Sequence, residues 1–335
     1  MTVRLLSLLA CSTLAACFRV GSSSSHVDSA PAPDHAQQDA PTDAPMDAPR
    51  DGPARDALLP EAGVCPPGGV TQPVIVSELS STFTDRNPTL TEDLLEIYFT
   101  TTRPGGPGGK DTWVATRASA AAPFGAPQVV AGVNWTGEDS DPEISSDGLE
   151  LFFASDRPSS GWGHIHVTTR PSRTAPFSAP LAVAAVNSIK GDYDPSLSKD
   201  ALTIYISSSR PNGNDSNIWV AGRASRSGSF STPVVLPGLV NSQYSEQDPA
   251  ISANGLFLLF SSTGRPGGMG GVDIWVAWRK DKTGPFAAPA LAAGLGSTAE
   301  QGSAFLTRDG KWVYFFSDRP GGVGGDDIYR AELCP

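Results

Sequence analysis

An internal repeat constrains this chain more than any other feature of its sequence. The dipeptide Arg-Pro returns at intervals of 53 to 55 residues, at Arg103, Arg157, Arg210, Arg265 and Arg319. The surrounding phrase returns with it, as a comparison of residues 141–158 with residues 248–266 shows. A fixed period of this length indicates one supersecondary unit that is stacked several times. The chain therefore contains five copies of one unit.

Each repeat contains four short segments with the pattern of β-strands. The first follows Asp-Pro, as in 143–145, and the third follows a glycine-rich turn, as in 273–277. The weak fourth segment follows a Pro-Phe-x-x-Pro phrase, as in 180–184. The second is apolar on nearly every residue, at 149–154, 202–207, 256–261 and 312–317, which predicts strands buried on both faces. Four such strands between Gly/Pro turns are typical of a propeller blade. We predict an all-β fold, a single five-bladed β-propeller with four-stranded blades.

The two ends of the repeat region complement each other. Residues 73–79 match the fourth strand of a repeat, whereas the last repeat stops after its third strand signal at 327–333. We therefore expect the N-terminal strand to complete the last blade, which removes an open sheet edge. Cys65 and Cys334 flank these two segments, and in an exported protein they predict a disulfide. Two free thiols remain the alternative.

The N-terminal residues have the pattern of an export signal. Arg4 is followed by the apolar run 5–14 and then by Leu14-Ala15-Ala16-Cys17, which resembles a bacterial lipobox. We predict a lipoprotein signal peptide at 1–17 with an acylated Cys17; an ordinary cleaved secretory signal is the alternative. Phe18, where the enterobacterial sorting pattern has Asp for inner-membrane retention, favours an outer-membrane lipoprotein of the cell envelope, facing the periplasm or the cell surface.

The segment between this signal and the repeats is rich in Pro, Ala, Asp and Ser. It lacks the apolar residues needed to offset the entropy of ordering. We therefore predict a disordered tether at 18–64 and the propeller at 65–335.

Three phrases of the repeats carry a family resemblance. They are Asp-Pro-x-x-Ser-x-Asp-Gly, Ser-Asp-Arg-Pro-Gly-Gly-x-Gly-Gly and Asp-Ile-Trp/Tyr. Over residues 87–331 the sequence resembles the WD-like β-propeller repeats of the TolB type, which are common in bacterial envelope proteins. The resemblance implies a non-enzymatic role in binding or scaffolding. The chain departs from TolB itself because it has five repeats and no visible N-terminal α/β domain.

Residues that differ among the repeats are the candidates for a binding surface. We expect Trp135, Tyr193 and Tyr244 at the loop tips of one propeller face, together with Trp162, Met269 and Arg308. Exposed aromatic residues are typical anchors of interfaces. The expected partner is an envelope protein or a glycan. The net charge of −11 argues against nucleic acid, and we expect membrane contact through the lipid anchor only.

Acidic residues suggest a second candidate site at the central channel. We expect Asp141, Asp194 and Asp248, with Asn87 and Gly302, to start the innermost strands and to ring one mouth of the channel. We expect Glu138, Asp139, Asp192, Glu246 and Glu300 beside them. Converging carboxylates would bind Ca²⁺ or another cation, as in a calcium-stabilised structural module. They would alternatively cap strand ends beside a solvated acidic rim, in which case no cofactor and no metal is bound.

Catalysis requires more than the repeats offer. A five-bladed glycoside hydrolase would need a pair of channel carboxylates about 5 to 9 Å apart, and we assign no catalytic residue. His164 and His166 share a strand face, but packing predicts their role better than metal binding. We expect structural roles for the residues that repeat in the blades. The five arginines would donate hydrogen bonds that fix turns or join blades. The turn before the second strand would be held by Asp147, Asp200, Asn254 and Asp309, and loop amides would be bound by Asp111, Asp273 and Asp327.

Overall fold

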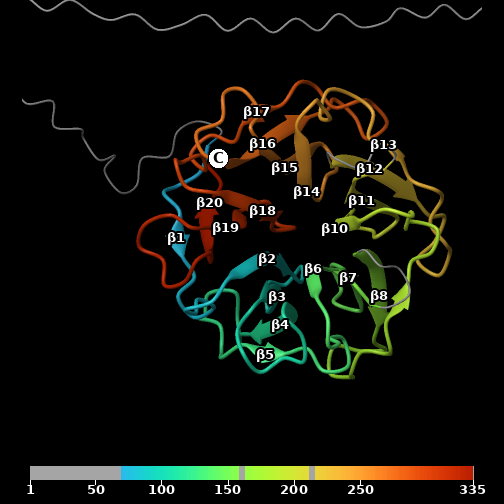
Figure 1. Cartoon of the computed structure of the whole chain (residues 1–335), viewed down its shortest axis with the longest axis vertical. Helices are drawn as coiled ribbons and strands as arrows, with labels where there is room; N and C mark the ends of the chain where they lie inside the picture. The colour runs from blue at the N-terminus through green and yellow to red at the C-terminus, as the bar shows by residue number, and fades with distance from the viewer. Residues whose placement is uncertain (1–68, 158–162, 211–215, 335) are drawn as a thin grey trace, which may run out of the picture. The chain divides into compact units, whose positions relative to one another are not determined.

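The computed structural model describes residues 69–157, 163–210 and 216–334, which form a five-bladed β-propeller (Figure 1). The chain divides into two units, 1–57 and 58–335, and all described residues belong to the second. The predicted signal peptide with Cys17, the predicted tether, Cys65 and Trp162 lie outside the described residues. In the part of the chain that the structure describes, no helix is long and apolar enough to cross a bilayer.

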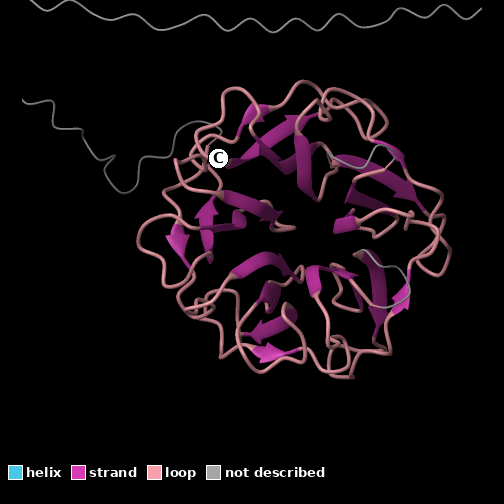
Figure 2. Cartoon of the chain, viewed as in Figure 1, coloured by secondary structure: helices cyan, strands magenta, loops and turns pink. Residues whose placement is uncertain are grey.

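The described residues contain twenty strands, joined by turns and loops (Figure 2). Blade 1 consists of β2 (Asp85–Leu90), β3 (Glu96–Thr101), β4 (Asp111–Thr116) and β5 (Gln128–Val129). Blade 2 consists of β6 (Asp139–Ile144), β7 (Glu150–Ser155), β8 (His164–Thr169) and β9 (Leu181–Ala182). Blade 3 consists of β10 (Asp192–Leu197), β11 (Thr203–Ser208), β12 (Asn217–Gly222) and β13 (Val234–Val235).

The remaining blades follow the same order. Blade 4 consists of β14 (Ser245–Ile251), β15 (Phe257–Thr263), β16 (Val272–Trp278) and β17 (Ala290–Leu291). Blade 5 consists of β18 (Gln301–Leu306), β19 (Trp312–Ser317), β20 (Asp327–Glu332) and β1 (Val74–Ile75). Every blade is an antiparallel sheet whose first strand lies innermost, and the second strands β3 and β7 are buried at every residue. The predicted fold and the predicted burial of both sheet faces are confirmed.

The N-terminal strand closes the ring. β1 pairs with β20, with Val74 opposite Arg330, and the two strands lie side by side in Figure 1. Val70 forms a bridge with Leu333, and the Cys334 N–H donates to the Gly69 carbonyl at 2.9 Å. The predicted strand exchange is confirmed. The pairing of Cys65 with Cys334 stays a prediction, because Cys65 lies outside the described residues.

The repeated arginines fix turns, as the sequence predicts. Arg103 donates to the Leu79 carbonyl at 2.5 Å and to Asp85 at 2.6 Å, so it ties the turn after the second strand to the loop before the first strand. Arg157, Arg210 and Arg265 bind an equivalent carbonyl and an equivalent acid. Of these two partners, Arg319 has the carbonyl, that of Leu295 at 3.2 Å. Blade 5 differs because Gln301 stands where the other blades have an acid.

The repeated acidic residues also fix loops. Asp147 accepts from the Leu149 N–H at 3.1 Å, and Asp200, Asn254 and Asp309 make the equivalent bond in their blades. Asp273 accepts from the Met269 and Gly270 N–H groups at 2.8 and 3.0 Å, and Asp111 and Asp327 accept from loop amides likewise. Their predicted roles in turns and loops are confirmed.

Candidate functional site

The candidate channel residues lie at a bulge in each innermost strand. The register of the innermost pair shifts there, and the residue at the shift has a φ between +48° and +55°: Asn87, Asp141, Asp194, Asp248 and Ser303. Asn and Asp tolerate this left-handed conformation better than other residues with a Cβ. Two expectations are therefore corrected. These residues are third or fourth in their strands rather than first, and Ser303, not Gly302, is the fifth member.

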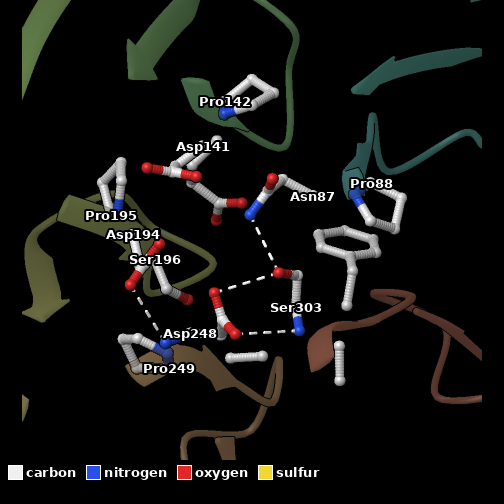
Figure 3. A pocket seen from close by; sticks show the side chains of 14 residues that line it. Asn87, Pro88, Asp141, Pro142, Asp194, Pro195, Ser196, Asp248, Pro249 and Ser303 are labelled. Atoms are coloured by element: carbon white, nitrogen blue, oxygen red, sulfur yellow. Dashed lines mark hydrogen bonds between the residues drawn. The ribbon is translucent and has the colours of Figure 1, made fainter. Parts of the chain in front are cut away.

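Hydrogen bonds join the ring residues of neighbouring blades (Figure 3). Asp194 accepts from the Asp248 N–H at 3.3 Å, and Asp248 accepts from the Ser303 N–H at 3.1 Å. The Asn87 amide donates to Ser303 Oγ at 2.9 Å. The side chains thus satisfy backbone groups that the bulge removes from the ladder, and they tie neighbouring innermost strands together.

The ring also concentrates negative charge in a confined space. Burial, and then the charge of Asp248, raise the pKa of Asp141 to about 6. Burial, followed by the charges of Asp248 and Asp141, raises the pKa of Asp194 well above its ordinary value. Among the described residues, however, no group of three or more His, Cys, Asp or Glu side chains is arranged to hold a metal ion.

The cavity at the ring is small. Its volume is about 40 Å³, and its lining consists of the ring residues and their immediate neighbours along the innermost strands. A water molecule takes about 30 Å³ in the liquid, whereas sites for small organic ligands measure about 300–1,000 Å³. The cavity at this level is therefore large enough for a water molecule or an ion and far smaller than a site for a small organic ligand.

Deeper in the channel, a buried ion pair crosses the ring. Arg308 of blade 5 binds Glu143 of blade 2 at 3.1 Å, and their side chains are 2% and 6% exposed. Arg308 also donates to the Ile251 and Leu197 carbonyls, at 3.3 and 3.2 Å, on the two intervening blades. The expectation that Arg308 belongs to an exposed binding face is wrong, because the guanidinium extends inward from the end of β18.

Sequence reasoning missed Glu143. It is the only acid at its position, where the other blades have Thr89, Ser196, Ala250 and Phe305. It accepts from Thr89 Oγ1 at 2.8 Å and from the Leu197 N–H at 2.9 Å. Burial raises its pKa, and Arg308 opposes that shift. A lone carboxylate among small or apolar residues of the innermost strands was the available signal.

The expected acidic rim forms only in part. Asp139, Asp192 and Glu246 are fully buried under the repeated arginines and are not at an open channel mouth. Glu138 is exposed and pairs with Lys110 at 3.0 Å, and Glu300 is also exposed. Burial raises the pKa of Asp139 to about 6, even though Arg157 lies at 3.1 Å. The sequence pattern did not distinguish the buried acids from the exposed ones.

The candidate aromatic residues lie before or at the start of the innermost strands of blades 2, 3 and 4. Because all innermost strands start on one side of the ring, Trp135, Tyr193 and Tyr244 share one propeller face. All three are half-buried. Trp135 Nε1 donates to Asp156 Oδ1 at 2.9 Å, and Tyr193 Oη accepts from the Gly163 N–H at 3.2 Å. Tyr244 Oη accepts from Gln243 at 3.1 Å.

The two histidines lie on β8. His166 is buried, stacks on Phe153 with ring centroids 6.0 Å apart, and lies 3.0 Å through its Nδ1 from the His164 carbonyl. Burial lowers the pKa of His166. The packing role predicted for His166 is confirmed.

Comparisons with known proteins identify the architecture. No family model matches the sequence, and no curated protein matches it either. Among solved structures, the GH43_1 enzyme from Xanthomonas citri is 15% identical, with a TM-score of 0.53 over 77% of this chain and 93% of that one. The arabinanase Arb43A of Bacillus subtilis is 12% identical, with a TM-score of 0.51 over 76% and 96%. At these identities the similarity shows the fold alone.

TolB from Acinetobacter baumannii is also similar. It is 15% identical, with a TM-score of 0.48 over 77% of this chain. The chain spans 56% of that protein's length.

Proposed function

We propose that this chain is a non-enzymatic binding or scaffolding module of the cell envelope. In this proposal a lipid on Cys17 holds it at a membrane, and the tether at 18–64 presents the propeller. The observation that carries the proposal is the narrowness of the channel. The cavity of about 40 Å³ is too small for an organic substrate, and the Arg308–Glu143 pair crosses the ring below it. Recognition then falls to the surface of the propeller.

The face that carries Trp135, Tyr193 and Tyr244 is the proposed recognition surface, for an envelope protein or a glycan. These residues are not repeated among the blades, so they give one sector of the ring its own chemistry. Each side chain combines an apolar ring with a polar atom, which suits both a protein surface and a sugar face. Their hydrogen bonds hold the side chains in place before a partner binds, which reduces the entropy lost on binding.

The test is a double substitution on this face. We expect Tyr193→Ala with Tyr244→Ala to weaken retention of a partner from envelope extract at least tenfold, because two anchors are lost. The matched control is Leu181→Ala, which removes an apolar side chain that is 69% exposed on the outer strand β9. If the double Tyr variant and the control are both folded and the double variant still retains the partner as well as the wild type does, the assignment of this face is contradicted.

A glycoside hydrolase is the second candidate, and one observation favours it. Asp141, with a pKa raised to about 6, has the property of a general acid, and the fold resembles that of the GH43_1 enzyme solved with xylotriose. The cavity volume opposes this candidate. Incubation with xylo- and arabino-oligosaccharides decides between the two, because sugar release that disappears in Asp141→Asn would refute the non-enzymatic proposal.

A calcium-stabilised structural module is the third candidate. The ring of Asp141, Asp194 and Asp248 supports it only through its charge, since these side chains also accept bonds from backbone N–H groups of the next blade. We propose that no cofactor is needed. A melting temperature that falls on chelation and recovers with Ca²⁺ would instead favour the metal.

A further inference from the structure

A large apolar cavity lies between blades 4 and 5, and it is called here the seam groove. Its volume is about 580 Å³. It is defined by Val70, Phe257, Leu259, Trp278 and Leu333, with Gly69 and Cys334 also in its lining. Trp278 is 56% exposed and Phe257 is 46% exposed, although both are large apolar side chains. The groove lies where the two ends of the propeller meet.

At the other four blade junctions a phenylalanine fills the equivalent space. Phe177 of blade 2 packs edge-on against Tyr98 of blade 1, and Phe230 of blade 3 packs likewise against Phe152 of blade 2, with centroids 6.3 and 6.1 Å apart. Phe286 and Phe124 are buried in the clusters that join blades 3 and 4 and blades 5 and 1.

Val70 is the counterpart of these phenylalanines in blade 5. Thr71, the residue after Val70, donates its N–H to the Glu332 carbonyl at the end of β20, at 2.8 Å. In blade 2, the residue after Phe177 donates its N–H in the same way to the carbonyl of the last residue of β8, also at 2.8 Å. The aromatic partner is lost as well, because Leu259 stands where blades 1, 2, 3 and 5 have Tyr or Phe. Two aromatic rings are thus replaced by smaller side chains at this junction.

The polar part of the junction is also lost. In blade 2, Arg170 stacks on Phe177 at 4.7 Å and binds Glu96 of blade 1 at 2.6 Å. Leu333 takes the place of this arginine in blade 5. The Arg170 N–H donates to the Leu149 carbonyl at 3.0 Å, and the Leu333 N–H makes the equivalent bond to the Lys311 carbonyl at 2.7 Å. Phe257 takes the place of Glu96. Apolar side chains therefore stand in the seam groove where Arg170 and Glu96 form an ion pair between blades 1 and 2, and where Arg223 and Glu150 form one between blades 2 and 3.

We propose that residues 58–64 of the same chain occupy the seam groove and place Leu58 and Leu59 against Trp278 and Phe257. At the other junctions the residues just before the phenylalanine belong to the segment that spans from the third strand to the fourth. In blade 5 the residues that come before Val70 in the sequence correspond to the second half of that segment, and Gly69, the first described residue, lines the groove.

The sequence and the reach of this segment fit the groove. Leu58 and Leu59 are the only adjacent pair of large apolar residues between positions 21 and 68. About ten residues separate Leu59 from Gly69, and an extended chain of that length spans roughly 33 Å. Attachment at Gly69 gives the segment a high effective concentration at the groove, so it competes well with a second molecule. This proposal does not depend on the proposed function.

The test is a photo-crosslinking amino acid in place of Trp278 in the full mature chain. We expect irradiation to join position 278 to residues 58–64, as identified by peptide mass spectrometry. Mixing isotope-labelled with unlabelled chains tells a bond within one molecule from a bond between two. The same crosslinker in place of Leu181, which is 69% exposed on blade 2, should not capture residues 58–64.

A pair of matched variants completes the test. Leu58→Ser with Leu59→Ser should lower the crosslink yield at least fivefold, because the apolar anchors are gone. Val27→Ser with Met46→Ser, which removes apolar residues farther from Gly69, should leave the yield unchanged. Capture of a second copy, capture of another molecule, or no capture at residues 58–64 would each overturn the proposal.

Discussion

Asp141 and its neighbours in the ring show what one residue position must satisfy in this fold. The position has a positive φ, faces the channel and presents an acceptor to the next blade. Asn87 meets the first two demands without a charge and donates to Ser303 Oγ. Ser303 meets them in blade 5. The negative charge of the three aspartates is therefore not needed to build the bulge.

Removal of one of these charges should stabilise the protein at neutral pH. Burial raises the folded-state pKa of Asp141 to about 6, so between about pH 4 and pH 6 the native protein binds more protons than the unfolded chain. The free energy of unfolding consequently falls as pH rises through this window. We expect Asp141→Asn to raise it by roughly 1–2 kcal/mol at pH 7 and to leave it unchanged near pH 4.

The measurement is urea denaturation of both proteins at the two pH values. A variant that is less stable than the wild type at pH 7 would contradict the idea that the buried charge of Asp141 costs stability. Glu78→Gln is a suitable control, because Glu78 is an exposed acid of the chain outside the channel.

The Arg308–Glu143 pair should respond to substitution in the opposite way. Arg308→Met leaves a buried carboxylate without its cation, so we expect it to lower the free energy of unfolding by about 3–5 kcal/mol. The double variant Arg308→Met with Glu143→Leu removes both charges and should recover most of that loss. A double-mutant cycle by chemical denaturation measures the coupling, and additive effects would show that the pair is unimportant.

At the scale of the strands, the sequence allowed the elements to be predicted closely. The apolar run 149–154 predicts β7, which the structure places at Glu150–Ser155. The bulges could not be predicted, because Asp-Pro usually marks the start of a strand and only the three-dimensional ladder shows the shift in register. Arg308 was misplaced for a similar reason. Its burial depends on Glu143, which is 165 residues away in the chain.

The closing strand offers a test of the strand exchange. Leu79, in the connection between β1 and β2, is fully buried in the core that joins blades 5 and 1. We expect Leu79→Ala to lower the free energy of unfolding by about 2–5 kcal/mol, since it leaves a cavity in that core. Val74→Ala on β1, where the side chain is 51% exposed, should change it by less than about 0.5 kcal/mol. Equal effects of the two substitutions on thermal or urea unfolding would contradict this packing.

At the scale of the whole molecule, counting repeats was enough to predict the ring, its five blades and the way it closes. The candidate site was less accessible to such reasoning. Repetition identifies what all blades share, such as Arg103 and its counterparts, whereas the Arg308–Glu143 pair and the seam groove arise from residues that break the repeat. Departures such as Val70, which stands where four blades have phenylalanine, become meaningful only when the blades are superimposed.

The composition of blade 5 also sets an order of events during synthesis. β1 leaves the ribosome about 250 residues before its partner β20. Until β20 arrives, the apolar side of the β1 segment has no sheet to join, and the other four blades form an arc with two unpaired ends. Partially made or truncated chains should thus be recognised by chaperones and proteases, and the stability of the circle should appear only when the last strand is in place.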